Sequence, residues 1–226
     1  MALRILVADD HEVVRRGLCA LLEARPGWQV CAEASDGREA IAKARELRPD
    51  IVVMDIGMPS LNGLAAAGQI MQHNPRQRIL ILTITSSEQI IREVLEVGAR
   101  GFVLKSDAAR DLVTAVEALE QGRIFFTPQV GDMVLSGYLN GGGAKTVNLP
   151  RLTAREREIV QLLAEGKSTK EVAAVLHLSV KTAETHRSNV MRKLCIHSVS
   201  ELVLYAIRNN IIQASVGPQG AKSSAA

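Results

Sequence analysis

The chain of 226 residues has the composition of an ordinary globular protein, with 47% hydrophobic and 23% charged residues. This length allows one large or two small domains, and the composition excludes disordered and fibrous proteins. The longest purely aliphatic stretch, Ile79–Leu82, is far shorter than the roughly 18 apolar residues that span a bilayer. The first residues also lack the basic start and apolar block of a signal peptide. We therefore expect a cytoplasmic protein without membrane contact.

The net charge of +3 is divided unevenly along the chain. Residues 1–123 carry 15 basic and 17 acidic side chains, whereas residues 150–213 carry 10 basic and 6 acidic ones. The C-terminal part is thus positive and the N-terminal part slightly negative. Such asymmetry is typical of an anion-binding domain joined to a neutral or acidic domain.

The three cysteines, Cys19, Cys31 and Cys195, are widely separated in the sequence. Each has apolar neighbours, and none has the C-x-x-C spacing of a zinc or redox site. Thiols of a cytoplasmic protein are kept reduced. We expect all three to be buried, reduced thiols.

Short β-branched runs alternate with helical patterns over residues 1–123. Five runs predict strands, at Leu3–Ala8, Trp28–Glu33, Ile51–Asp55, Arg78–Thr83 and Gly101–Leu104. Apolar residues recur three and four positions apart in segments that predict helices, at Glu12–Glu23, Arg38–Leu47, Glu88–Val97 and Ala109–Glu120. Asp36-Gly37 indicates a turn, and Gly98 suits a left-handed helix cap. This alternation predicts an α/β fold with a doubly wound, five-stranded parallel sheet covered by helices on both faces.

A glycine-rich stretch at 137–150 separates this first domain from a helical region. Such a stretch cannot pack a core, so we place a flexible linker at 124–149. Beyond it, three capping boxes each predict the start of a helix, at Thr153 with Glu156, Ser168 with Glu171, and Ser198 with Glu201. A further helix is expected after Ser179. We predict an all-α four-helix domain at 150–213 and a disordered tail at 214–226.

Polar residues stand at the carboxyl ends of four predicted strands. Asp9 and Asp10 follow the first strand, Asp55 ends the third, Thr83 ends the fourth and Lys105 follows the fifth. Ligands of doubly wound sheets bind at this edge. Clustered carboxylates suit a hard cation such as Mg²⁺, and a lysine with a hydroxyl would complete a phosphoryl site.

Three motifs at these strand ends are similar to those of a known family. Val7-Ala8-Asp9-Asp10-His11, Met54-Asp55-Ile56-Gly57-Met58-Pro59 and Phe102-Val103-Leu104-Lys105 resemble the flavodoxin-like receiver domains of two-component response regulators. The resemblance covers the N-terminal half. It implies that Asp55 is the phosphoacceptor. Mg²⁺ would be held directly by Asp10, Asp55 and the Gly57 carbonyl, and by Asp9 through water. Thr83 and Lys105 would contact the phosphoryl oxygens.

The same resemblance implies a switch formed by Thr83 and Phe102. A phosphoryl group would draw Thr83 inward and free space for Phe102, which would change the surface of the fourth helix and fifth strand. Ile84 departs from the family, in which the residue after this hydroxyl is often smaller. We therefore expect slow reaction with small phosphodonors.

Each of these residues also has an ordinary structural interpretation. Asp9 and Asp10 would cap the first helix, because its free amides and its dipole attract acidic side chains at the N-terminus. Asp55 would be a turn residue, Lys105 a solvated surface charge and Phe102 a core residue. Their combination at four strand ends favours the receiver interpretation.

The helical region contains two motifs similar to those of the LuxR-type helix-turn-helix domain. Leu152-Thr153-Ala154-Arg155-Glu156-Arg157-Glu158 and Ser179-Val180-Lys181-Thr182-Ala183-Glu184-Thr185-His186 resemble that four-helix domain over residues 150 to about 213. In helix-turn-helix motifs the second helix of the pair lies in the major groove of DNA. That helix is expected at Val180–Leu194. A helical bundle with a solvated basic face is the alternative.

The spacing within this helix separates an inner from an outer face. Ala183, His186, Val190 and Leu194 would face inward, although the family more often has valine at position 183. The candidate DNA contacts are then Lys181, Glu184, Thr185, Arg187, Ser188 and Arg192. The basic side chains would bind phosphates, whereas Glu184 could accept a hydrogen bond from cytosine and Thr185 could contact a thymine methyl group.

Apolar residues on the last helix have two interpretations. Leu202, Val203, Tyr205 and Ala206 correspond to the surface with which the family forms homodimers, but core burial explains them equally well. Aromatic residues make up 3% of the chain and none lies among the basic ones, which argues against binding of single strands.

Three functional hypotheses follow from these motifs. The first is a response regulator of the NarL/FixJ class, not an enzyme, which a sensor histidine kinase phosphorylates on Asp55 and which then binds double-stranded promoter DNA. The second is a regulator that acts without phosphorylation. The third is an aspartate-nucleophile phosphatase, although such enzymes usually carry Asp-x-Asp on the first strand instead of adjacent Asp9-Asp10.

Overall fold

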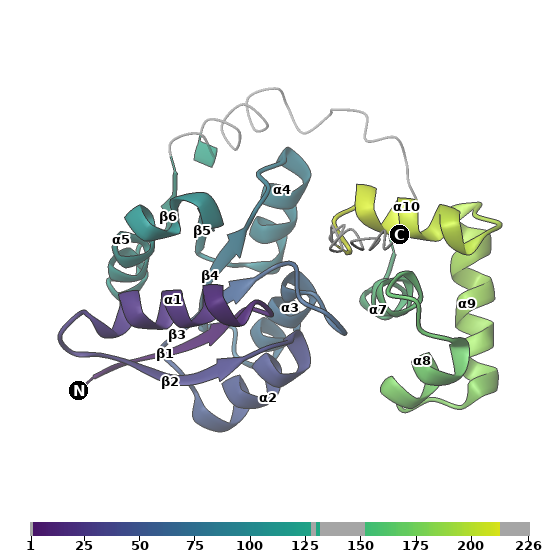
Figure 1. Ribbon diagram of the computed structural model, residues 1–226, viewed down its shortest axis with the longest axis horizontal. Coiled ribbons are helices and arrows are strands. Elements are labelled where there is room, and N and C mark those ends of the chain that lie inside the picture. The colour runs from purple at the N-terminus through teal and green to yellow at the C-terminus, as the bar shows by residue number, and fades with distance from the viewer. Residues whose placement is uncertain (1, 128–129, 132–151, 213–226) are drawn as a thin grey trace, which may run out of the picture.

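The computed structural model describes residues 2–127, 130–131 and 152–212 in two parts, one α/β and one all-α (Figure 1). Most of the expected linker and the expected tail lie outside the described residues. Within the described ranges, no helix has the length and apolar character needed to cross a membrane.

The α/β part is built on a parallel sheet with the strand order β2-β1-β3-β4-β5-β6. The strands are β1 (Leu3–Ala8), β2 (Trp28–Ala34), β3 (Ile51–Asp55), β4 (Arg78–Thr83), β5 (Gly101–Leu104) and β6 (Phe125–Phe126). The predicted count of five was one short. The missing strand, β6, has two residues, too few to show periodicity, and it pairs with β5 from the stretch expected to be linker.

Helices cover both faces of the sheet, as predicted for a doubly wound fold (Figure 1). One apolar cluster joins the sheet to α1 (Glu12–Glu23) and α5 (Ala108–Glu120). The other joins it to α2 (Gly37–Leu47), α3 (Gly63–His73) and α4 (Glu88–Val97). The expected left-handed cap is present at Gly98, which has a φ of 87°. Asp36, expected only in a turn, also caps α2, because its side chain accepts from the amides of Arg38 and Glu39.

The C-terminal part packs α7 (Ala154–Ala164), α8 (Thr169–Val175), α9 (Val180–Leu194) and α10 (Val199–Arg208) around its own apolar cluster. The predicted four-helix domain is therefore confirmed. The capping boxes of α7 and α8 are complete. The third is half formed: Ser198 accepts from the Glu201 amide, but the Glu201 carboxylate accepts from the His197 amide.

The expectation that all three cysteines are buried was wrong. All are free thiols, but only Cys19 is buried, whereas Cys31 is intermediate and Cys195 is exposed. Cys195 caps the C-terminus of α9 with a left-handed φ of 54°, and this turn removes its side chain from the buried face of the helix. Apolar sequence neighbours did not reveal that turn.

Candidate functional site

Parallel pairing brings the carboxyl ends of β1, β3, β4 and β5 to one edge of the sheet. There Lys105 Nζ lies 2.8 Å from Asp9 Oδ2 and 2.9 Å from Asp55 Oδ2. Both carboxylates are fully buried. Side chains from three strand ends, far apart in the sequence, thus form one ionic cluster.

The segment after β1 orients the two adjacent aspartates. Asp9 Oδ1 accepts from the His11 amide at 2.9 Å, and His11 Nδ1 lies 2.8 Å from Asp10 Oδ1. The N-cap of α1 is His11, so both aspartates precede the cap position. The ordinary interpretation, in which they serve as helix caps, therefore does not describe their positions.

Burial and charge act in opposite directions on Asp55 and Lys105. Burial raises the pKa of the Asp55 carboxyl, and the ion pair with Lys105 opposes this rise. Burial alone would lower the pKa of Lys105, but Asp55 and Asp9 outweigh it, so the pKa is raised. Lys105 is therefore a charged and largely buried group, at 12% exposure, and not a solvated surface charge.

The carboxylates also fit a cation. Asp9 Oδ2, Asp10 Oδ1 and both carboxylate oxygens of Asp55 are buried and have no hydrogen-bond partner among the described residues apart from their ionic contacts. Ligand atoms of Asp9, Asp10 and His11 lie within 4.8 Å of one another. Oxygen atoms without donors are the ligands that Mg²⁺ prefers, whereas the His11 nitrogen is not. The acidic cluster is thus suited to a hard divalent cation, and Gly57 is the second residue of the loop that follows Asp55.

The Thr83 hydroxyl is hydrogen-bonded to the backbone of the turn that follows it. Thr83 Oγ1 accepts from the Thr85 amide at 3.2 Å and donates to the Thr85 carbonyl at 3.3 Å. Phe102 is fully buried in the cluster that contains the apolar residues of α4. Ile84 is 63% exposed, so most of its side chain faces solvent.

The loop of residues 56–62, between β3 and α3, is packed tightly against Asp55. A Cβ atom at Gly63 would collide with the Asp55 carbonyl oxygen, so only glycine allows α3 to begin this close. The Gly63 amide donates to the Ile56 carbonyl at 2.9 Å. The Asn62 side chain caps α3 by accepting from the Ala65 amide. Both ends of the loop are therefore fixed.

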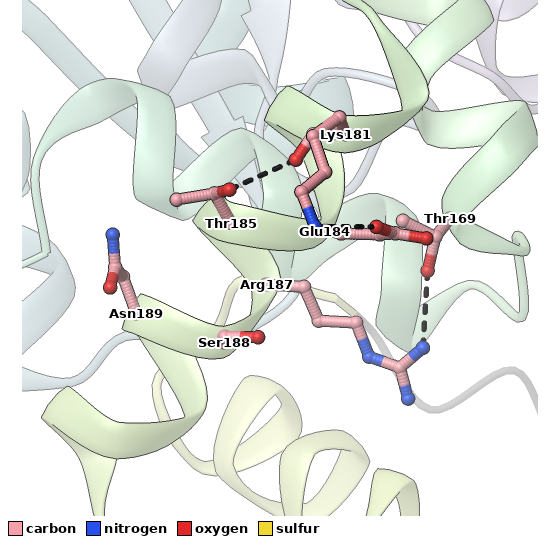
Figure 2. Close-up of a pocket in the computed structure, with 7 residues that line it drawn as sticks. All are labelled: Thr169, Lys181, Glu184, Thr185, Arg187, Ser188 and Asn189. Carbon is pink, nitrogen blue, oxygen red and sulfur yellow. Dashed lines mark hydrogen bonds and ion pairs between the residues drawn. The ribbon is translucent and has the colours of Figure 1, made fainter.

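Helix α9 presents a polar face to solvent, and Figure 2 shows seven residues that line a pocket along it and α8. Arg187 is half-buried and donates to Thr169 Oγ1 at 3.1 Å, while Lys181 lies 3.9 Å from Glu184. The other predicted DNA contacts are exposed: Lys181, Glu184, Thr185, Ser188 and Arg192. Of the residues expected to face inward, Ala183 and Val190 are fully buried, and His186 and Leu194 are half-buried.

Family models match both parts of the chain. Residues 5–117 match the response regulator receiver domain, and residues 150–206 match the bacterial regulatory proteins of the luxR family. The response regulator protein VraR of Staphylococcus aureus is 35% identical over 213 residues, which cover 94% of this chain and 100% of VraR. The chain belongs to the two-component response regulators of the NarL/FixJ class.

Solved structures of other response regulators are similar to this response regulator. The LuxR-family regulator from Aurantimonas sp. is 39% identical, with a TM-score of 0.58, and the match covers 62% of this chain and 99% of that one. RcsB from Salmonella enterica serovar Typhimurium, solved bound to a promoter with the phosphomimetic BeF3⁻, is 28% identical, with a TM-score of 0.60. That match covers 91% of this chain and 98% of RcsB.

On α10, two of the four residues considered for dimer contact are core residues of this response regulator. Leu202 and Ala206 are at most 1% exposed. Val203 and Tyr205 are half-buried, and Leu204, which the sequence did not single out, is 52% exposed. Core burial is therefore the correct interpretation of Leu202 and Ala206.

The contacts of α7 with the receiver domain were not predicted from the sequence. Glu158 and Gln161 are buried, and both bond to receiver residues. Figure 1 shows α7 next to the receiver domain and α9 beyond it. No sequence signal marked these residues, because exposed polar positions on a helix look the same whether or not another domain covers them.

Proposed function

We propose that this response regulator accepts a phosphoryl group on Asp55 from a sensor histidine kinase, and that phosphorylation changes its binding to promoter DNA. The observation that carries the proposal is the position of Lys105 Nζ, 2.9 Å from Asp55 Oδ2 and 2.8 Å from Asp9 Oδ2. A buried carboxylate beside a fixed cation is suited to attack phosphorus while charge on the incoming group is neutralised.

Each residue of the cluster has a defined part in this transfer. A carboxylate oxygen of Asp55 bonds to phosphorus as the bond between phosphorus and the phosphohistidine nitrogen of the kinase breaks. Lys105 and Thr83 then contact the phosphoryl oxygens. Asp10, Asp55 and the Gly57 carbonyl would hold Mg²⁺ directly, with Asp9 holding it through water. Bound Mg²⁺ would neutralise negative charge on the transferring group.

The switch requires Thr83 to change partners. Its hydroxyl must leave the Thr85 backbone to reach a phosphoryl oxygen, and Phe102 would move into the space that this frees. The proposed output is a changed surface at α4 and β5, not turnover of a substrate. We therefore infer a phosphoryl acceptor rather than an enzyme.

The DNA-binding part uses the exposed face of α9. Lys181, Arg187 and Arg192 are assigned to phosphates, and Glu184, Thr185 and Ser188 to base edges. The similarity to RcsB, which was solved on a promoter, supports DNA binding by this domain. A homodimer would bind paired half-sites, with Val203, Leu204 and Tyr205 as the available apolar surface of α10. We infer that this activity takes place in the cytoplasm, where promoter DNA and the phosphoryl-donating part of the kinase would both be present.

The test is incubation with Mg²⁺ and either acetyl phosphate or a competent kinase, followed by intact mass measurement. One added phosphoryl group is expected, and Asp55→Ala should abolish it. Asp50→Asn, which changes a carboxylate at the opposite end of β3, is the matched control and should be phosphorylated normally.

Two other outcomes would favour the alternatives. An unchanged mass with a competent kinase would indicate a regulator that acts without phosphorylation. Steady hydrolysis of unrelated phosphoesters would indicate an aspartate-nucleophile phosphatase.

A further inference from the structure

An arginine of helix α1 joins the ends of two neighbouring strands beside the acidic cluster. Arg15 Nη1 donates to the Asp9 carbonyl oxygen at 2.7 Å, and Arg15 Nε donates to Glu33 Oε2, near the end of β2, at 2.9 Å. The arginine side chain is 15% exposed, so it is largely shielded from water. A guanidinium group can make both bonds at once because its donors form a rigid fork. Arg15 thus ties the end of β1 to the end of β2.

The Asp9 backbone is consequently held on both sides. Its amide donates to the Ala34 carbonyl at 3.0 Å, and its carbonyl accepts from Arg15. That carbonyl belongs to the planar peptide unit that joins Asp9 to Asp10. A bond that fixes the carbonyl oxygen therefore also fixes the direction in which the chain continues to Asp10.

The side chain of Asp10 has less support than that of Asp9. The Asp9 carboxylate contacts Lys105 Nζ and accepts from the His11 amide. Among the described residues, the Asp10 carboxylate has one ionic contact, to His11 Nδ1 at 2.8 Å, and that imidazole is 63% exposed. An exposed imidazole is a poor anchor because it can turn in solvent. The position of Asp10 therefore depends mainly on its backbone.

The charge and the hydrogen bond of Arg15 have opposite effects on a nearby cation. Loss of Arg15 would remove a positive charge and leave Glu33 unpaired, so charge alone predicts tighter Mg²⁺ binding. Loss of the bond to the Asp9 carbonyl predicts weaker binding, because outer-shell partners of metal ligands change the affinity by about ten- to a hundredfold. Glu33 is 48% exposed, and water and salt screen its charge, so we expect the hydrogen bond to decide the direction.

We propose that Arg15 is a positioning residue for Mg²⁺ at the acidic cluster: it fixes the peptide unit between Asp9 and Asp10 and thereby holds Asp10 in place for the cation. The inference rests on the proposed function, in which Asp10 is a direct Mg²⁺ ligand. Arg15 has donors and no acceptor, so it acts through the Asp9 carbonyl and not as a ligand. Glu33 orients the guanidinium group from the other side.

The first test is Arg15→Met in the full chain, with Mg²⁺ alone as the probe. Methionine keeps an apolar stem but donates to neither acceptor. The Mg²⁺ dissociation constant, measured by calorimetric titration, should rise about tenfold, the lower end of outer-shell effects because lost repulsion offsets part of the change. Phosphorylation by acetyl phosphate should be slower at low Mg²⁺ and approach the parent rate at saturating Mg²⁺, whereas a defect at Asp55 itself would persist at saturation.

The matched control is Arg16→Met. Arg16 is the next residue of α1, its side chain is 74% exposed, and it pairs with Glu12. Both variants lose one positive charge from the same helix, but Arg16 makes no bond to the Asp9 carbonyl among the described residues. The Mg²⁺ dissociation constant of this variant should stay within about twofold of that of the parent chain.

A second variant, Arg15→Lys, separates charge from geometry and guards against a folding defect in the first. It keeps the charge, but a single ammonium group does not reproduce the fork that reaches both Asp9 and Glu33. Its Mg²⁺ affinity should lie between those of the parent chain and Arg15→Met. Unchanged or tighter Mg²⁺ binding by both Arg15 variants would overturn the inference. A parent chain that binds no Mg²⁺ would instead overturn the cation site of the proposed function, so the two failures are distinguishable.

Discussion

Lys105 Nζ lies 2.9 Å from Asp55 Oδ2, and the two side chains are 12% and 0% exposed. Breaking a buried ion pair from one side leaves the other charge without compensation, which costs far more than the pair itself contributes. Here the loss of the lysine would leave two buried carboxylates, Asp9 and Asp55, facing each other. Lys105 therefore contributes to the stability of the unphosphorylated receiver domain as well as to the proposed phosphoryl transfer.

Replacing Lys105 by methionine should lower the free energy of unfolding by about 3 kcal/mol. Added Mg²⁺ should restore part of this loss, because a cation among the carboxylates replaces the missing charge. Urea unfolding with and without Mg²⁺ measures both effects. Arg92→Met is the control, since it removes an exposed i,i+4 helix pair with Glu88 that is worth only about 0.3 kcal/mol. Equal stability of the Lys105 variant and the parent would contradict the prediction.

Two glycines of α3 should respond in opposite ways to alanine. Gly63→Ala would drive a methyl group into the Asp55 carbonyl, so it should destabilise the domain by about 2 kcal/mol and displace Asp55. Gly68 has no atom near its missing Cβ, so Gly68→Ala should stabilise the same helix by about 0.5 kcal/mol. Thermal unfolding of the two variants compares them directly, and a similar response from both would be inconsistent with this packing.

The strand ends could be predicted because parallel pairing converts a sequence pattern into a spatial cluster. Asp9, Asp55 and Lys105 each end or follow a β-branched run, and adjacent parallel strands necessarily bring such residues to one edge. The strand pattern therefore predicts the shared edge, whereas the contact of Lys105 with Asp9 and Asp55 also depends on the strand order β1-β3-β4-β5. By contrast, the direction of the Thr83 hydroxyl depends on a local turn, which the strand pattern does not encode.

The docking of α7 on the receiver domain could not be predicted in the same way. The helical period of α7 identifies Ile159, Leu162 and Leu163 as core residues, and the structure buries them. Gln161 lies on another face, where sequence alone predicts solvent contact. Its burial results from the packing of two domains, and side-chain hydrogen bonds across such a boundary leave no periodic signal.

Lys181→Ala should weaken DNA binding for all sequences alike. Its side chain is 89% exposed on α9 and its ammonium group is assigned to a phosphate, so its loss should flatten the slope of log affinity against log salt by about one unit. Titration of specific and unrelated duplexes at several salt concentrations measures this. Arg16→Ala, which removes an exposed cation from α1, should leave the slope unchanged. Unaltered affinity of the Lys181 variant would remove this residue from the interface.

Glu39 should make the stability of the receiver domain depend on acidic pH. Hydrogen bonds from Lys43 and then from the Ser35 amide lower the pKa of Glu39 from 4.5 to about 2. The folded-state pKa lies below the unfolded one, so the ionised side chain stabilises the fold above pH 4.5, and this contribution is lost as the pH falls toward 2.

The melting-temperature difference between the parent and Glu39→Gln should therefore be largest near neutral pH and shrink as the pH falls below 4.5. Carboxyl NMR titration of the parent gives the pKa of Glu39 directly. A midpoint at the ordinary 4.5 would show that the bonds from Lys43 and Ser35 do not favour the ionised form, and the difference would then not change with pH.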